Sequence, residues 1–273
     1  MNRRARSLLG VVLVSCTVVI AGCGAAARSG SQVTEMTVAR ITVAAASDLR
    51  PAFEELGALF TAETGTKVVF SFGSSGQLRE QIINGAPFDL FASANGAFVD
   101  QVIDAGRGVA ATRADYALGR IVLWVSADAE LPVSIEELVE PRFRRIAIAN
   151  PQHAPYGLAA AQALTTAGVF SSVQDRLVYG ENISDTFRIA QSGNAEIGII
   201  ALSLAVADGS DYRLIPADLH EPLQQALVVT SIGSQGEAAT AFADFIGSPT
   251  GREVMTRFGF VLPGESSPAE QDQ

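Results

Sequence analysis

The sequence has 273 residues, and its 19 basic and 29 acidic side chains give a formal net charge of −10 at neutral pH. This acidic balance argues against nucleic acid as a partner, because phosphates need basic neighbours. Both cysteines, Cys16 and Cys23, lie near the N-terminus, so a disulfide framework in the remaining chain is excluded. We therefore expect stability to come from a packed hydrophobic core.

The N-terminus has the layout of a secretory signal. Three arginines within the first six residues precede an apolar run at 8–21, which is shorter than the about 20 residues that a spanning helix needs. The stretch at 19–23 (VIAGC) resembles a bacterial lipobox, which predicts a lipoprotein signal peptide over 1–22 and lipid attachment at Cys23. The alternative is an ordinary signal peptide with a chance cysteine. Removal of the signal leaves 16 basic against 29 acidic residues, a net charge of −13.

The segments next to the anchor and at the C-terminus have the composition of unfolded chain. Residues 23–38 are small and polar without periodicity, which predicts a flexible tether. Residues 265–273 are expected to form a disordered tail. Together with the signal, the tether predicts an extracytoplasmic protein, in the periplasm or on the outer face of the cell membrane, held there by a lipid anchor.

Strand and helix patterns alternate from residue 41 onward. The apolar run at 41–46 predicts a buried strand, and the apolar spacing from Leu49 to Phe60 predicts a helix after it. Further strands are predicted at 67–72, 88–92, 121–126, 145–149, 197–202 and 226–230. Further helices are predicted at 77–84, 98–105, 135–139, 158–167, 183–192, 237–246 and 250–258.

This alternation predicts an α/β protein with mostly parallel sheets. The strand–helix units are too many for one compact sheet, so we expect two lobes. The first is predicted to comprise residues 39–119 plus 226–264, and the second residues 120–225. A ligand would lie in the cleft between the lobes, facing the carboxyl ends of the strands.

Four places combine small or hydroxyl residues with the start of a predicted helix: 46–47, 74–76, 154–157 and 181–183. A helix N-terminus exposes unpaired N–H groups and a partial positive charge, so it binds anions without Lys or Arg. Each place alone has an ordinary explanation, such as an N-cap or a turn. Their combination predicts a site that binds a fully ionised oxyanion through neutral donors.

The order of the segments AAASDL, SFGSSGQL, NGAPFDLFASAN, ANPQHAPYGLAAAQAL and IGIIAL strongly resembles the ModA family, the molybdate-binding proteins of bacterial ABC importers. The resemblance covers Ile41 to Pro263. It implies a two-lobed periplasmic-binding-protein-like fold of type II, with a hinge of crossing strands and the ligand cleft between the lobes. It also implies molybdate, and tungstate with it, as the ligand, no cofactor, and a membrane permease with its ATPase as partners. We expect a monomer.

The family's ligand positions carry over unevenly. They match the hydroxyl and N–H of Ser47, the hydroxyl of Ser75, and the backbone N–H groups of Tyr156 and Ile183. A tyrosine that many members have after the IG-I-V strand is Ala201 here, so that hydrogen bond is lost. Asp48 would repel a dianion if it pointed inward, so we expect it to face the helix N-terminus or solvent.

Three alternatives remain. One is a structural or adhesion role, which predicts no response to small ligands. Another is a binding protein for a different oxyanion, above all sulfate, which is also free of protons and would have to be excluded by size. The third is an enzyme with a serine nucleophile. Gln77 breaks the G-x-S-x-G pattern, nothing places His153 or His220 beside a serine, and His153 is interpreted as a solvated loop residue. No Cys/His cluster or HExxH motif predicts a metal cation site, and we expect a binding protein rather than an enzyme.

Overall fold

The computed structural model describes residues 39–126 and 129–265. Several predicted features lie outside these residues: the signal peptide, lipid attachment at Cys23, the whole tether, and the tail from residue 266 on. In the described part of the chain, none of the helices has the length and apolar character that crossing a membrane requires.

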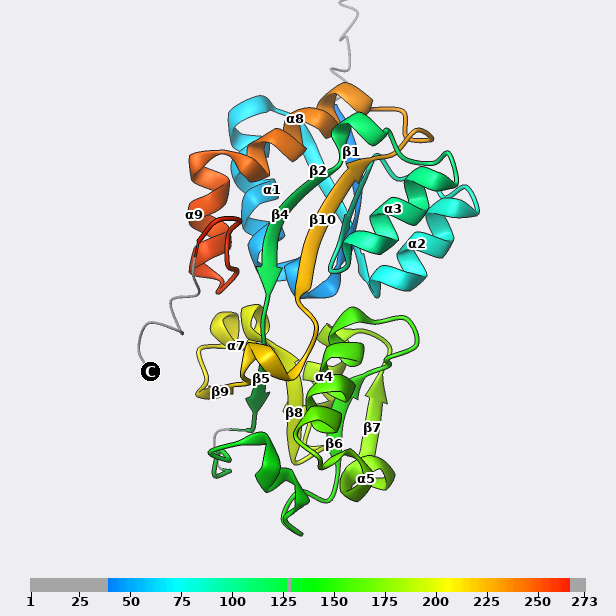
Figure 1. Ribbon diagram of the computed structural model, residues 1–273. Helices are drawn as coiled ribbons and strands as arrows, with labels where there is room; N and C mark the ends of the chain where they lie inside the picture. The colour runs from blue at the N-terminus through cyan, green and yellow to red at the C-terminus, as the bar shows by residue number, and fades with distance from the viewer. Residues whose placement is uncertain (1–38, 127–128, 266–273) are drawn as a thin grey trace, which may run out of the picture. The chain divides into compact units, whose positions relative to one another are not determined.

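The first of two five-stranded sheets has the strand order β2-β1-β3-β10-β4 (Figure 1). Its strands are β1 (Arg40–Ala46), β2 (Lys67–Gly73), β3 (Leu90–Ser93), β4 (Ala114–Gly119) and β10 (Leu223–Val229). β1 pairs in parallel with β2 and β3, whereas β10 is antiparallel to both β3 and β4. We call this sheet and its helices the first lobe.

The second sheet has the order β7-β6-β8-β5-β9 and, with its helices, forms the second lobe. Its strands are β5 (Ile121–Trp124), β6 (Ile146–Ala149), β7 (Leu177–Gly180), β8 (Ile197–Ala201) and β9 (Tyr212–Leu214). β6 is parallel to β7 and β8, and β5 is antiparallel to β8 and β9. The expectation of mostly parallel sheets is therefore wrong: half of the pairings in each sheet are antiparallel.

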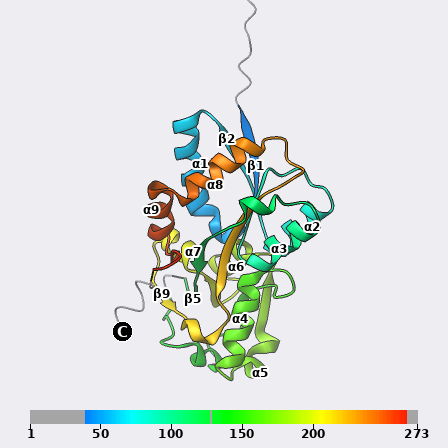
Figure 2. The same cartoon turned by 45° about the horizontal axis from the view of Figure 1, so that its top comes forward.

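Helices cover both faces of the first sheet (Figures 1 and 2). On one side lie α1 (Arg50–Thr64), α8 (Gly236–Gly247) and α9 (Pro249–Arg257), and on the other α2 (Ser75–Ile83) and α3 (Gly96–Asp104). The alternation of side chains along β1 explains the two layers. Val43 and Ala45 pack with the core on the α1 side, and Ala44 packs with the separate cluster of α2 and α3.

The helices of the second lobe are α4 (Pro155–Thr166), α5 (Phe170–Val173), α6 (Ile183–Gln191) and α7 (Leu202–Asp208). α4 and α6 pack on β6 and β8, and α7 packs on β5 and β8. Short 3-10 helices complete the chain: η1 (Ser47–Leu49), η2 (Ala110–Thr112), η3 (Ile135–Val139), η4 (Gln174–Arg176) and η5 (Ala217–Leu219).

The chain passes between the sheets at two adjacent places. It leaves the first sheet after β4, crosses at Arg120 and enters the second sheet as β5. It returns as β10, whose first residue, Leu223, pairs with Gly119 at the end of β4. The two crossings therefore lie side by side and form the hinge. The predicted lobe boundaries, between residues 119 and 120 and between residues 225 and 226, stay a prediction.

The core of the first lobe yields a stability prediction. Phe53 of α1 is fully buried, and its ring lies 5.9 Å from that of Phe70 and 6.2 Å from that of Phe242. Phe53→Ala should lower the free energy of unfolding by about 3–5 kcal/mol, because it removes apolar burial and leaves a cavity. Urea denaturation measures this. Leu59→Ala, at an exposed position of the same helix, should cost less than about 1 kcal/mol. Equal losses in the two variants would contradict the placement of Phe53 in the core.

Candidate functional site

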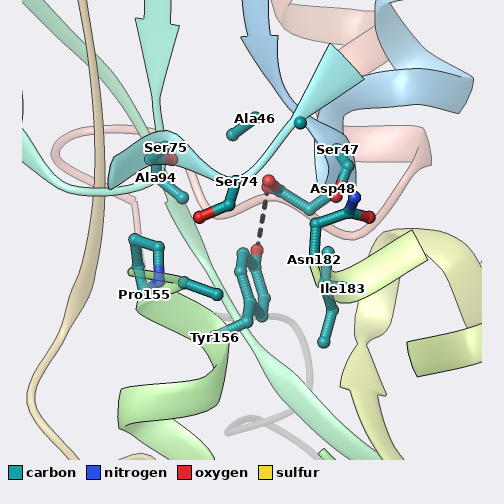
Figure 3. A pocket seen from close by; sticks show the side chains of 12 residues that line it. Ala46, Ser47, Asp48, Ser74, Ser75, Ala94, Pro155, Tyr156, Asn182 and Ile183 are labelled. Atoms are coloured by element: carbon teal, nitrogen blue, oxygen red, sulfur yellow. Dashed lines mark hydrogen bonds between the residues drawn. The ribbon is translucent and has the colours of Figure 1, made fainter. Parts of the chain in front are cut away.

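A small cavity lies between the lobes, where the carboxyl ends of β1, β2 and β3 face the N-termini of α4 and α6 (Figure 3). The space it encloses, including space open to solvent, is about 190 Å³. The lining residues are Ala46, Ser47, Asp48, Gly73, Ser74, Ser75, Ala94, Ala154, Pro155, Tyr156, Asn182 and Ile183. All four residues predicted as anion donors are among them.

The first lobe contributes serines at the ends of its strands. Ser47 follows β1 directly and begins the 3-10 turn that continues into α1. α2 begins at Ser75, two residues earlier than predicted, because the expected tight loop forms the first turn of this helix. The Ser75 hydroxyl oxygen accepts the N–H of Ala94 at 3.0 Å. This hydrogen bond occupies one lone pair of the oxygen, so the hydroxyl hydrogen can still be donated to a ligand.

The second lobe contributes the starts of two helices. Pro155 occupies the first turn of α4 and has no N–H, so Tyr156 carries the first backbone donor of this helix. Gly157 lets α4 begin close to β6, since a Cβ there would lie 2.1 Å from the carbonyl oxygen of Ala149. In α6, the Asn182 side chain accepts the N–H of Asp185 at 3.0 Å. This cap does not involve the N–H of Ile183.

The lobes contact each other beside the end of β1. Ser184 of α6 donates its hydroxyl to the carbonyl oxygen of Ser47 at 2.9 Å. Ser203 of α7 donates to the carbonyl oxygen of Asp48 at 2.7 Å. These bonds satisfy backbone carbonyls that face the other lobe, so they hold one wall of the cavity closed.

A second interlobe contact lies at His153. Its carbonyl oxygen accepts the Gly76 N–H at 3.0 Å and also the hydroxyl of Ser74. Its Nδ1 lies 2.9 Å from the same hydroxyl oxygen, and its Nε2 lies 3.9 Å from Oε2 of Glu181. The interpretation of His153 as a solvated loop residue is therefore wrong.

The proximity of Ser74 and His153 does not create a nucleophile. The hydroxyl has one hydrogen, and it donates that hydrogen to the His153 carbonyl oxygen. Nδ1 must then act as the donor toward the hydroxyl oxygen, so no free base is present at that atom. The pair serves as a contact between the lobes.

Asp48 is the site residue whose position the sequence did not reveal. It is fully buried, and its Oδ2 accepts the Tyr156 hydroxyl at 3.0 Å (Figure 3). The same oxygen accepts Nε2 of Gln225 at 2.9 Å. The expectation that Asp48 faces the helix or solvent is wrong, because its partners are side chains of α4 and β10. Oδ1 has no hydrogen-bond partner among the described residues.

Burial dominates the electrostatics of this cluster. Desolvation raises the pKa of Asp48 from 3.8 to about 7, although the hydrogen bonds from Tyr156 and Gln225 lower it. Burial and the nearby carboxylate also raise the pKa of Tyr156 well above 10, so this hydroxyl keeps its proton. Gly119 of β4 leaves room for the Tyr156 side chain, because a Cβ at position 119 would lie 2.2 Å from the Tyr156 hydroxyl oxygen.

The cavity lining is nearly free of charge. Of the described residues that line it, none is basic, and Asp48 is the one acid. Sequence reasoning did not place Asp48 in the lining, whereas Ser74 and Asn182 lie in the segments predicted to form the site but were not predicted as donors. Ala201 is buried at the end of β8 and is not among the lining residues.

The raised pKa of Asp48 predicts how stability depends on pH. The folded state binds the proton more tightly than the unfolded state, so the stabilisation is full below about pH 4 and is lost as pH rises through about 7. Asp48→Asn removes this titration while keeping an oxygen acceptor. Relative to the variant, the wild type should lose about 4 kcal/mol of unfolding free energy between pH 4 and 8. Urea denaturation in buffers without oxyanions measures the difference; parallel pH profiles would contradict it.

The close approach at Gly76 predicts that the lobes respond to a single methyl group. A Cβ at Gly76 would lie 2.6 Å from the carbonyl oxygen of His153, in the other lobe. Gly76→Ala should therefore push the lobes apart and raise the radius of gyration measured by small-angle X-ray scattering. Gly247→Ala, where a Cβ meets nothing within 4 Å, is the control. A scattering profile like that of the wild type would show that this contact does not limit the approach.

Comparison with known proteins identifies the family. The model of the family "Bacterial extracellular solute-binding protein" matches residues 41–261. The molybdate-binding protein ModA of Rhodobacter capsulatus is 36% identical over 225 residues, which cover 81% of this chain and 87% of that protein. The ModA of Azotobacter vinelandii is 34% identical over 229 residues, covering 82% and 90%. The solved structure of the Azotobacter vinelandii periplasmic molybdate-binding protein matches with a TM-score of 0.76 at 32% identity, covering 82% of this chain and 99% of that one. This chain belongs to the bacterial extracellular solute-binding proteins and, within them, to the ModA family, whose members bind solutes for transport rather than catalyse reactions.

Proposed function

We propose that this protein captures molybdate outside the cytoplasm and delivers it to an ABC importer. The observation that carries the proposal is the cavity itself, which gathers neutral hydrogen-bond donors from both lobes and has no basic residue in its described lining. The relatives named as molybdate-binding proteins support the choice of anion.

The donor set comprises the hydroxyl and N–H of Ser47, the hydroxyl of Ser75, and the backbone N–H groups of Tyr156 and Ile183. Three helices, α2, α4 and α6, begin at the cavity wall. Each adds about half a positive charge at its N-terminus, so a dianion gains electrostatic stabilisation without a salt bridge. Donors on both lobes also mean that the anion favours the closed arrangement.

Selectivity follows from proton content and size. Molybdate and tungstate are fully ionised and suit hydrogen-bond donors, whereas phosphate carries a proton at neutral pH and would need the ionised form of Asp48, the one acid of the described lining, as an acceptor. Tungstate is nearly the same size as molybdate and should bind with it. Sulfate also lacks a proton and is therefore the nearest competitor. It is smaller than molybdate, so it would leave some donors at the cavity wall without a partner. Sulfate binding is for this reason the second candidate function, behind molybdate binding.

The N-terminal sequence supports an anchored location. The predicted signal peptide and lipobox place the lipid on Cys23, with residues 23–38 as tether. A membrane permease and its cytoplasmic ATPase would receive the anion when the closed lobes dock. The protein would act as a monomer, with the oxyanion as cargo and with no cofactor.

Thermal unfolding of the chain that follows Cys23, with molybdate, tungstate, sulfate or phosphate, tests the function. A ligand at 100 times its Kd should stabilise the folded state by about 2.7 kcal/mol. We expect this from molybdate and tungstate alone. The double variant Ser47→Ala/Ser75→Ala should lose the shift, and Ser171→Ala, at an exposed position of α5, should keep it. Stabilisation mainly by sulfate or phosphate, or by none of the four, would refute the ligand assignment.

A further inference from the structure

Asp48 is out of place in a cavity built for dianions. The side chain is fully buried, lines the cavity and leaves Oδ1 without a hydrogen-bond partner among the described residues. An ionised carboxylate and a dianion in the same small cavity repel each other strongly. A buried oxygen without a partner is also costly, unless something binds to it.

We propose that Asp48 takes up one proton from solvent when the cavity captures a fully ionised oxyanion, so that ligand binding is coupled to protonation. The inference rests on the proposed function and adds a regulating ion to the same site. The proton goes to Oδ1, because Oδ2 already accepts two hydrogen bonds, from Tyr156 and Gln225. Protonation removes the negative charge and turns the one acidic group of the lining into a hydrogen-bond donor.

The surroundings leave Asp48 as the group that titrates. Among the described residues, the titratable groups that interact with it are Tyr156 of α4 and Tyr116 of β4, and burial keeps the pKa of both well above 10. None of the described residues that line the cavity or shift the pKa of Asp48 is basic. Arg50, two residues further along the chain, lies 3.3 Å from Glu54. The remaining groups that face Asp48 are neutral: the amide of Gln225 and the hydroxyl of Ser203.

The pKa of the free protein sets the pH range. Burial raises the pKa of Asp48 to about 7, and a bound dianion would raise it further. Below about pH 7 the carboxyl is already protonated, so affinity is independent of pH. Above it, the free protein is ionised while the complex is protonated, so affinity should fall about tenfold per pH unit.

Isothermal titration calorimetry with molybdate tests the coupling. Titrations at pH 6, 7, 8 and 9, each in two buffers of different ionisation enthalpy, measure both Kd and the protons taken up. We expect almost no uptake at pH 6, an uptake close to one proton at pH 8, and a Kd about tenfold higher at pH 9 than at pH 8. Molybdate stays fully ionised over this range, so the proton must bind to the protein.

Two variants assign the proton to Asp48. Asp48→Asn imitates the protonated carboxyl and should bind molybdate with a Kd independent of pH and with no proton uptake at pH 8. Tyr156→Phe keeps the backbone donor but removes a hydrogen bond that lowers the pKa of Asp48, so its affinity should begin to fall at a higher pH. Asp104→Asn, which removes an equal charge at the exposed end of α3, should keep the wild-type profile.

The outcomes separate this inference from the proposed function. Molybdate binding with no proton uptake at pH 8, or uptake that persists in Asp48→Asn, would overturn the coupling and leave the proposed function intact. Absence of binding heat for molybdate at every pH would overturn both.

Discussion

The burial of one carboxylate where the lobes meet is the constraint on which the rest of the site depends. Asp48 comes from the end of β1, Tyr156 from the start of α4, and Gln225 from β10, which returns the chain to the first lobe. These three elements meet at a single oxygen, Oδ2. Because a buried acceptor that loses its donors is costly, the cluster fixes how the lobes and the hinge pack against each other. Gly119 belongs to the same arrangement, since only a residue without a side chain leaves room for the tyrosine hydroxyl.

An acidic protein can bind an anion because the two effects act at different distances. The net charge of −10 is spread over a surface where charges beyond about 10 Å are largely screened. The cavity wall consists of hydroxyl groups and helix starts within direct contact of a ligand. The same kind of group also joins the lobes: Ser184 and Ser203 donate to carbonyls at the end of β1, and Ser74 to that of His153. Small neutral donors therefore form both the cavity wall and the contacts that close it.

Local sequence patterns predicted most of the long helices and buried strands, because apolar periodicity is a property of neighbouring residues. They missed β4, β7 and β9, which are only partly buried, and the apolar helix α7, which follows β8 without a break. The antiparallel returns were missed because register depends on distant pairing. The structure places the four predicted donors in one cavity, and their roles as ligands stay predictions. The environment of Asp48 could not be predicted, since its partners lie 108 and 177 residues away in sequence.

Half of the donor residues in the proposed site would act through the main chain. Ile183 directly follows the N-cap of α6, and Tyr156 is the second residue after the N-cap of α4, so these N–H groups stay in place whichever side chain is attached. The Tyr156 side chain is held by its hydrogen bond to Asp48, whereas Ile183 can change in sequence during evolution while the anion senses no difference. A comparison of relatives by residue identity alone would classify position 183 as variable and overlook it. Redesign of the ligand preference would have to move the start of a helix, since exchanging these side chains leaves the donors unchanged.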